Sequence, residues 1–73
     1  MSVLNAVTAE PIKLTKRERT RRKLMTATRD LIYDRGIERV AILDITDAAG
    51  VAAGSFYNYF ENKAAIVAAI VDD

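Results

Sequence analysis

Apolar residues recur along the first half of the chain at the spacing of a helix. The positions i, i+3, i+4, i+7 and i+8 are occupied by Leu24, Ala27, Thr28, Leu31 and Ile32. Such positions share one side of a helix with about 3.6 residues per turn. Gly36 follows, and glycine adopts without steric cost the left-handed conformation in which many helices end. The pattern therefore predicts a first helix over about residues 15–35.

The second helix that the pattern predicts is short. It covers about residues 43–49 and places Ile45, Ala48 and Ala49 on its inner side. Gly50 then ends it, for the same reason that glycine ends the first helix. The chain is expected to turn sharply at this glycine.

Two further helices are predicted beyond that turn. One covers about residues 53–60 and buries Phe56 and Phe60, which lie one turn apart. The other covers about residues 63–72 and follows Asn62, a residue type favoured as a helix N-cap. Because β-branched residues nowhere alternate with polar ones, no strand is predicted and the fold class is all-α.

Residues 42–61, ILDITDAAGVAAGSFYNYFE, carry the features of a helix-turn-helix. That motif needs a buried residue late in its first helix, a residue tolerant of positive φ at the turn, and an apolar anchor after it. Ile45, Gly50 and Val51 meet these requirements, and Thr46 is small enough for the helix crossing. The alternative is a generic buried helical hairpin, which explains the glycine turn less well.

Composition narrows the classes of function. With 73 residues the chain is at most one small domain with a modest core. It has no Cys and no His, so thiolate metal sites, Cys nucleophiles and the commonest general base are excluded. We therefore expect neither an enzyme nor a bound cofactor or metal.

The N-terminal residues carry no targeting or membrane signal. No apolar run approaches the roughly 20 residues that cross a bilayer. The first residues lack the basic region and long apolar core of a secretory signal. Residues 1–12 are expected to form a flexible arm, and the protein is expected to be cytoplasmic and nucleoid-associated, with no membrane partner.

Charge is distributed unevenly along the chain. Residues 1–36 hold nine Lys/Arg and four Asp/Glu, a net +5, and residues 37–73 hold two and six, a net −4, which sum to +1. Seven of the first nine lie between Lys13 and Lys23. Such a cluster supplies the salt-sensitive part of nucleic-acid binding, but it is equally typical of a solvated helix start.

The stretch DITDAAGVAAGSFYNYFENKAAI resembles the signature of TetR-type bacterial transcriptional regulators. Its most specific part is GSFYNYF followed by Asn62-Lys63, and the likeness extends over about residues 16–71. It implies a three-helix, homeodomain-like bundle with a helix-turn-helix and the start of a fourth helix, over residues 13–73. It further implies a homodimeric repressor of double-stranded operator DNA. The ligand-binding and dimerisation domain, with its small-molecule effector, would lie outside this chain.

The resemblance also assigns functions to individual residues. Tyr57 and Lys63 would contact phosphate, and Tyr59 would contact the backbone or a base edge. The residues expected to read base edges are Ala52, Ala53, Gly54, Ser55 and Asn58. The residues expected to add backbone or minor-groove contacts come from the basic segment and include Lys13, Lys16, Arg17, Arg19 and Arg21.

The chain departs from the family pattern at three alanines. Ala41 and Ala52 replace the usual hydroxyl residues at two helix starts, and Ala53 replaces an often basic residue. Direct readout should therefore depend on Asn58 and on alanine methyl groups. Two other classes of protein remain as alternatives: a helical protein–protein module with an incidental basic face, and a recombinase-type DNA-binding domain with a basic arm.

Overall fold

The computed structural model describes residues 14–72, and nearly all of that range is helical. The elements in chain order are α1 (Lys16–Arg35), the 3-10 helix η2 (Ile37–Arg39), α2 (Ile42–Ala49), the 3-10 helix η3 (Ala53–Asn58) and α3 (Lys63–Asp72). Residues 14–72 contain no strand, which confirms the all-α fold. The expected arm over residues 1–12 and the candidate Lys13 lie outside the described range.

Helix α1 is defined at both ends by local chemistry. At its start Thr15 and Glu18 form a capping box: the Glu18 N–H donates to Thr15 Oγ1 at 3.0 Å, and the Thr15 N–H donates to Glu18 Oε1 at 2.9 Å. At its end Gly36 has φ 86° and ψ 151°, and its N–H donates to the Ile32 carbonyl. The predicted bounds of this helix are confirmed to within one residue.

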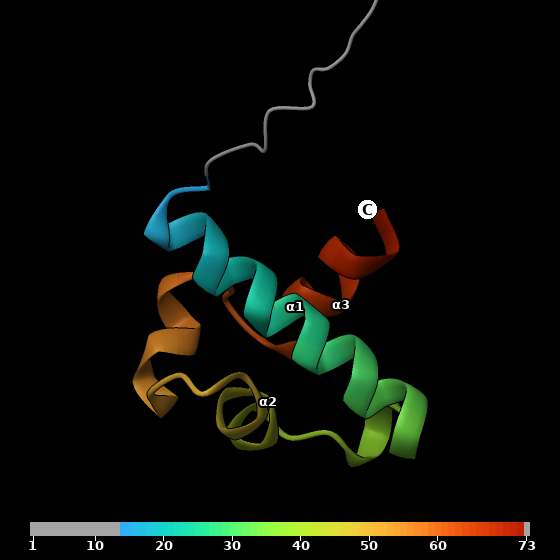
Figure 1. The fold of residues 1–73 in the computed structure, drawn as a ribbon. Helices are drawn as coiled ribbons and strands as arrows, with labels where there is room; N and C mark the ends of the chain where they lie inside the picture. The colour runs from blue at the N-terminus through green and yellow to red at the C-terminus, as the bar shows by residue number, and fades with distance from the viewer. Residues whose placement is uncertain (1–13, 73) are drawn as a thin grey trace, which may run out of the picture.

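The shorter elements pack around α1. In Figure 1, α2 is seen almost end-on beneath α1, η3 lies beside the N-terminal part of α1, and α3 lies on the other side. The shared core comprises Leu24, Met25, Ala27, Val40, Ile45, Phe56, Phe60 and Ile66. Phe56 is completely buried, so η3 is attached to the core at its centre. No helix within residues 14–72 has the length and apolar character needed to span a bilayer.

Two expectations about the helices need correction. The helix expected over residues 53–60 is a 3-10 helix that ends at Asn58, with Tyr59 in a turn. Ala52 supplies no side-chain cap to this segment, and its second residue, Gly54, is a poor helix former, so nothing local favours an α-helix there. Ala48 is exposed rather than inward-facing.

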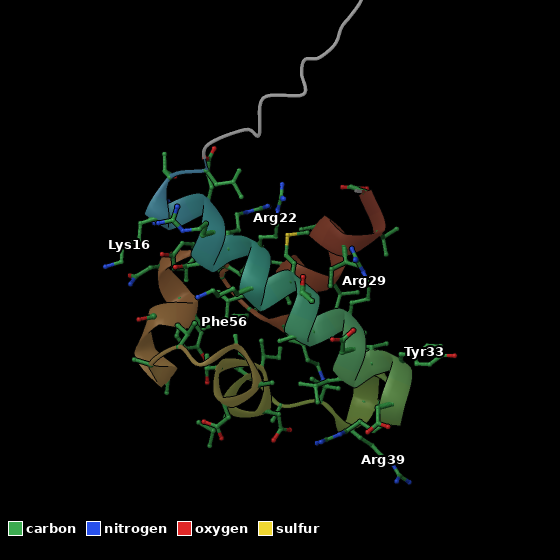
Figure 2. The ribbon with its side chains drawn as sticks, in the orientation of Figure 1. Lys16, Arg22, Arg29, Tyr33, Arg39 and Phe56 are labelled. Carbon is green, nitrogen blue, oxygen red and sulfur yellow. The ribbon has the colours of Figure 1, made fainter. Side chains whose placement is uncertain are left out.

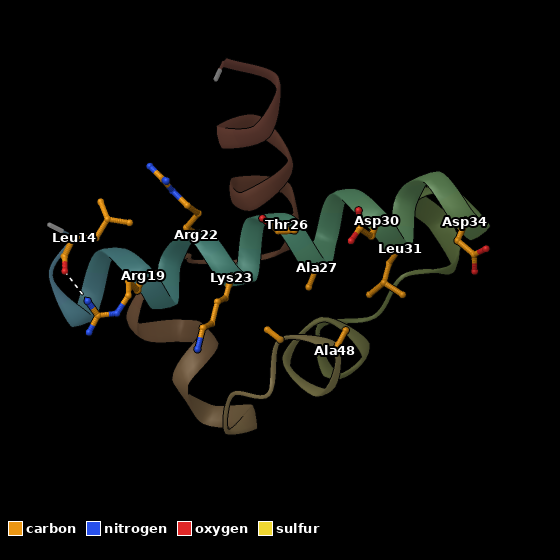
Figure 3. A pocket seen from close by; sticks show the side chains of 11 residues that line it. Leu14, Arg19, Arg22, Lys23, Thr26, Ala27, Asp30, Leu31, Asp34 and Ala48 are labelled. Atoms are coloured by element: carbon orange, nitrogen blue, oxygen red, sulfur yellow. Dashed lines mark hydrogen bonds between the residues drawn. The ribbon is translucent and has the colours of Figure 1, made fainter. Parts of the chain in front are cut away.

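Ala48 lines an open groove between α1 and α2. The apolar residues along this groove include Ala27, Leu31 and Ala49, and Arg19 and Lys23 stand at one end of it (Figure 3). The short side chains of α2 at this point leave the groove unfilled. That explains why an alanine at a helical core position remains in contact with solvent.

Candidate nucleic-acid interface

The turn between α2 and η3 has the geometry that a helix-turn-helix requires. Gly50 adopts the left-handed conformation with φ 71° and ψ 34°, as the sequence predicted. The Val51 N–H donates back to the Thr46 carbonyl at 2.9 Å. Thr46 is fully buried, and its hydroxyl donates to the Leu43 carbonyl at 3.1 Å. A small side chain bonded to its own helix lets α2 and η3 approach each other closely.

The residues of η3 divide into a buried and an exposed set. In a 3-10 helix side chains three residues apart align, and Tyr59 directly after η3 follows Phe56 at that spacing. Phe56 is buried and Tyr59 half-buried, so these two residues face the core. The residues that remain exposed are Ala52, Ala53, Gly54, Tyr57 and Asn58, while Ser55 is half-buried. Five of the residues expected to contact DNA are therefore accessible to solvent on or beside η3.

Tyr57 contacts Phe56 through its ring, but most of the residue is exposed to solvent. The ring lies edge-on to Phe56, with centroids 5.4 Å apart. The residue is nevertheless 60% exposed. An aromatic side chain held in this way has lost much of its rotamer freedom before any ligand arrives.

The start of α2 compensates in part for the alanine at position 41. The Ala41 N–H donates to Asp44 Oδ2 at 2.9 Å, so a carboxylate one turn later satisfies a backbone donor there. The same Asp44 oxygen lies 3.5 Å from Arg35 Nη1. Sequence reasoning missed this contact, although Asp three residues after the cap position is a recognisable signal.

Lys63 is occupied within the protein. Its Nζ donates to the Ile37 carbonyl at 2.9 Å and to the Val40 carbonyl at 3.0 Å. The residue is half-buried at the start of α3, where Asn62 Oδ1 accepts from the Ala65 N–H as an N-cap. The ammonium group thus joins α3 to the segment that leads into α2. One of its three N–H donors is left for another acceptor.

Two basic residues near the start of α1 contact η3 or the residues directly after it. Arg17 donates through Nη2 to the Asn58 carbonyl at 2.7 Å, and its Cζ lies 4.5 Å from the centroid of the Tyr59 ring. Arg21, one turn later, lies 5.0 Å from the Phe60 ring centroid. Both guanidinium groups therefore lie against residues 58–60, at the end of η3 and just after it.

The remaining bases at this end are exposed. They are Lys16, Arg19, Arg22 and Lys23. Arg19 Nη1 donates to the Leu14 carbonyl at 2.7 Å, which holds it near the N-terminal end of α1. Figure 2 shows Lys16 and Phe56 toward one end of α1, and Tyr33 and Arg39 at the other. The positive charge is concentrated at the end where η3 lies.

One carboxyl in this basic region is held in its charged form. The pKa of Glu18 lies below its ordinary value, chiefly because the Thr15 backbone N–H donates to it, with the Thr15 hydroxyl and then Arg22 adding to the effect. Glu18 therefore remains ionised, and it offsets one of the surrounding positive charges.

Comparison with known proteins agrees with this geometry. Residues 24–70 match the family described as bacterial regulatory proteins, tetR family. The chain belongs to this family. The members that it resembles are named as HTH-type transcriptional regulators.

Three relatives illustrate the match to the tetR family. The HTH-type transcriptional regulator TtgR of Pseudomonas putida is 38% identical over 63 residues, covering 84% of this chain and 30% of the relative. The uncharacterized regulator YvdT of Bacillus subtilis is 37% identical over 51 residues, covering 70% and 26%. The repressor KstR2 of Rhodococcus jostii is 36% identical over 47 residues, covering 64% and 23%. No solved structure gives a significant match.

The chain spans about 30% of the length of the first relatives. What it shares with them is the helix-turn-helix region, including the Gly50 turn and η3. Among the candidate residues on and beside η3, those exposed to solvent are Ala52, Ala53, Gly54, Tyr57 and Asn58. The structure holds Lys63 and Arg17 by internal contacts that the sequence did not reveal.

Proposed function

We propose that this chain is the DNA-binding part of a repressor that binds double-stranded operator DNA as a homodimer and is released by a small-molecule effector. In this proposal η3 enters the major groove. The observation that supports it best is the exposed surface of η3, where small residues come first and Tyr57 and Asn58 follow. Small side chains at the leading end let the backbone approach the base edges.

The phosphate contacts come from residues around this surface. The Tyr57 hydroxyl and the third N–H donor of Lys63 supply two of them. The exposed bases of α1 and Lys13 supply others, along the backbone or in the minor groove. Contacts of this kind set the position and the salt dependence of binding rather than its sequence preference.

Dimerisation and effector binding are assigned to a part of the protein outside this chain. The relatives are about three times longer than the stretch they share with this chain. Helix α3 supports the assignment: residues 64–71 carry no charged side chain, yet Val71 is 77% exposed. An apolar helix surface of this kind is stabilised by packing against further helices. Such a protein would act in the cytoplasm, at the nucleoid.

The test measures binding of the full-length protein to operator DNA selected from random sequences. Tyr57→Phe should weaken binding about tenfold or more, because it removes a hydroxyl that donates to a charged phosphate. Tyr33→Phe is the matched control, since Tyr33 is 94% exposed at the far end of α1. It should bind as the unchanged protein does.

The alternative function predicts a different outcome. If the chain is a helical protein–protein module, the selection yields no preferred DNA sequence. Tyr57→Phe and Tyr33→Phe then have equal effects on a weak, purely salt-dependent affinity. That result would overturn the proposal.

A further inference from the structure

We propose that Arg17 is a positioning residue that fixes η3 for base readout, and that it determines sequence specificity without itself contacting a base. The inference rests on the proposed function of η3. It departs from the expectation that Arg17 serves the DNA backbone. Its basis is the pair of contacts that Arg17 makes with Asn58 and Tyr59, at the end of the recognition segment, by which we mean η3 together with Tyr59.

Those two contacts join segments that are far apart in sequence. Arg17 Nη2 donates to the Asn58 carbonyl at 2.7 Å, across a separation of 41 residues. The guanidinium also lies over the Tyr59 ring, 4.5 Å from its centroid. A stacked guanidinium with one directed hydrogen bond fixes both the distance and the orientation of the two segments.

The recognition segment depends on this contact because no side chain caps its start and Arg17 binds the last carbonyl of η3. Ala52 provides no side-chain cap at its start. At its other end the Phe56 carbonyl accepts from both the Tyr59 and the Phe60 N–H, whereas the Asn58 carbonyl accepts from Arg17. A cation at the carboxyl end of a helix also interacts favourably with the helix dipole. Arg17 therefore serves as the C-terminal cap of η3.

The consequence for readout follows from the atoms involved. The carbonyl that Arg17 binds belongs to Asn58, whose side-chain amide is the best candidate for a bidentate contact with adenine. Tyr59 is the next residue, and Arg17 covers its ring. A shift of this end by about 1 Å displaces the amide relative to the base edge by more than a hydrogen bond tolerates. Loss of Arg17 should therefore cost discrimination between bases.

Two variants at this position separate the positioning role from a phosphate contact. Arg17→Lys keeps the charge but cannot both stack on the ring and direct an N–H to the carbonyl. Arg17→Gln removes the charge. Both are made in the full-length protein and measured against the selected operator and its single-base variants, at several salt concentrations. Arg39→Lys and Arg39→Gln are the controls, since Arg39 is exposed in η2 at the far end of α1 (Figure 2).

We expect Arg17→Lys and Arg17→Gln each to reduce the preference for the operator over its variants by about tenfold. The slope of log affinity against log salt should stay unchanged in both. The Arg39 variants should alter neither quantity. If Arg17 instead binds phosphate, Arg17→Lys keeps the base preferences. Arg17→Gln then makes the fall of log affinity with log salt less steep, by about 0.9 for each phosphate that the protein no longer neutralises. That pair of results overturns the inference.

A second variant keeps the test decisive where an Arg17 variant unfolds. Tyr59→Leu removes the ring on which the guanidinium lies but leaves every basic residue in place. It should reduce the base preference with an unchanged salt slope, and Tyr59→Phe, which keeps the ring but removes the hydroxyl, should not. Unaltered preference in a folded Tyr59→Leu protein argues against the inference. If the protein without substitutions shows no preference for any operator, the proposed function is wrong. If Arg17→Lys keeps the normal preference, only the inference about Arg17 is wrong.

Discussion

At the scale of single residues, η3 offers few side chains that can read a base. Ala52 and Ala53 present only methyl groups, and Gly54 has no side chain. Ser55 is half-buried, and a hydroxyl pairs with almost any base. Asn58 is exposed, and its planar amide can pair with adenine N6 and N7. In a 3-10 helix, which rises about 2.0 Å per residue, Asn58 lies about 8 Å along the axis from Gly54.

Asn58 should accordingly carry the largest share of direct base discrimination. Asn58→Ala in the full-length protein should reduce the preference for the operator over a variant at the contacted adenine by about 1–3 kcal/mol. Preferences at the other positions should stay unchanged. The measurement is the affinity for the operator and each single-base variant. A uniform loss of affinity would instead show that Asn58 contacts phosphate.

Lys63 should have two separable effects. Lys63→Ala should weaken binding about equally across DNA sequences, because phosphate contacts position the protein and carry no sequence information. It should also lower the melting temperature, since the Ile37 and Val40 carbonyls lose their donor. Affinity measurements on several DNA sequences and thermal unfolding check the two effects. A changed base preference with unaltered affinity would refute the phosphate assignment.

At the scale of elements, the first turn of α1 both starts that helix and holds η3, because Arg17 in this turn binds the Asn58 carbonyl. Thr15→Ala should destabilise the protein by about 1 kcal/mol, since a helix loses its N-cap. The pKa of Glu18 is lowered in the folded protein, so its contribution is present above the ordinary carboxyl pKa and is lost as pH falls through the folded one. Melting temperatures at pH 7 and pH 3 should therefore differ less for Glu18→Gln, which removes the ionisable group, than for the unchanged protein. Equal differences would contradict a shared capping box.

A second prediction at this scale concerns the turn between α2 and η3. Gly50→Ala should destabilise the protein by about 1–2 kcal/mol, because a Cβ at φ 71° is strained even though no atom lies within 4 Å of it. Gly54→Ala is the matched control: Gly54 is equally unobstructed, but its φ is outside the strained range. It should be neutral or slightly stabilising, since alanine favours helical conformations more than glycine does. Denaturant unfolding of the two variants checks the difference, and equal losses would show that the conformation at Gly50 is not the cause.

At the scale of the whole molecule, the features that sequence could predict are the locally determined ones. Helical spacing gave the bounds of α1 and α3, and Gly50 marked the turn, because each depends on residues close in sequence. The contacts of Arg17 with η3 and of Lys63 with the segment before α2 join residues 41 and 23–26 positions apart. No local pattern specifies such contacts, so the sequence indicated a basic cluster without indicating which bases are held internally.

The isolated chain and a dimer should differ in how they bind DNA. Residues 14–72 contain one helix-turn-helix, whereas a dimer presents two recognition segments to half-sites about 34 Å apart. The isolated chain should bind operator DNA weakly, because one exposed η3 supplies few base contacts and its bases are concentrated at the start of α1. Its affinity should fall steeply with salt, since most of it then comes from phosphate contacts. Titrations of the 73-residue chain and the full-length protein at several salt concentrations compare the two, and tight, specific, salt-insensitive binding by the isolated chain would refute the requirement for a dimer.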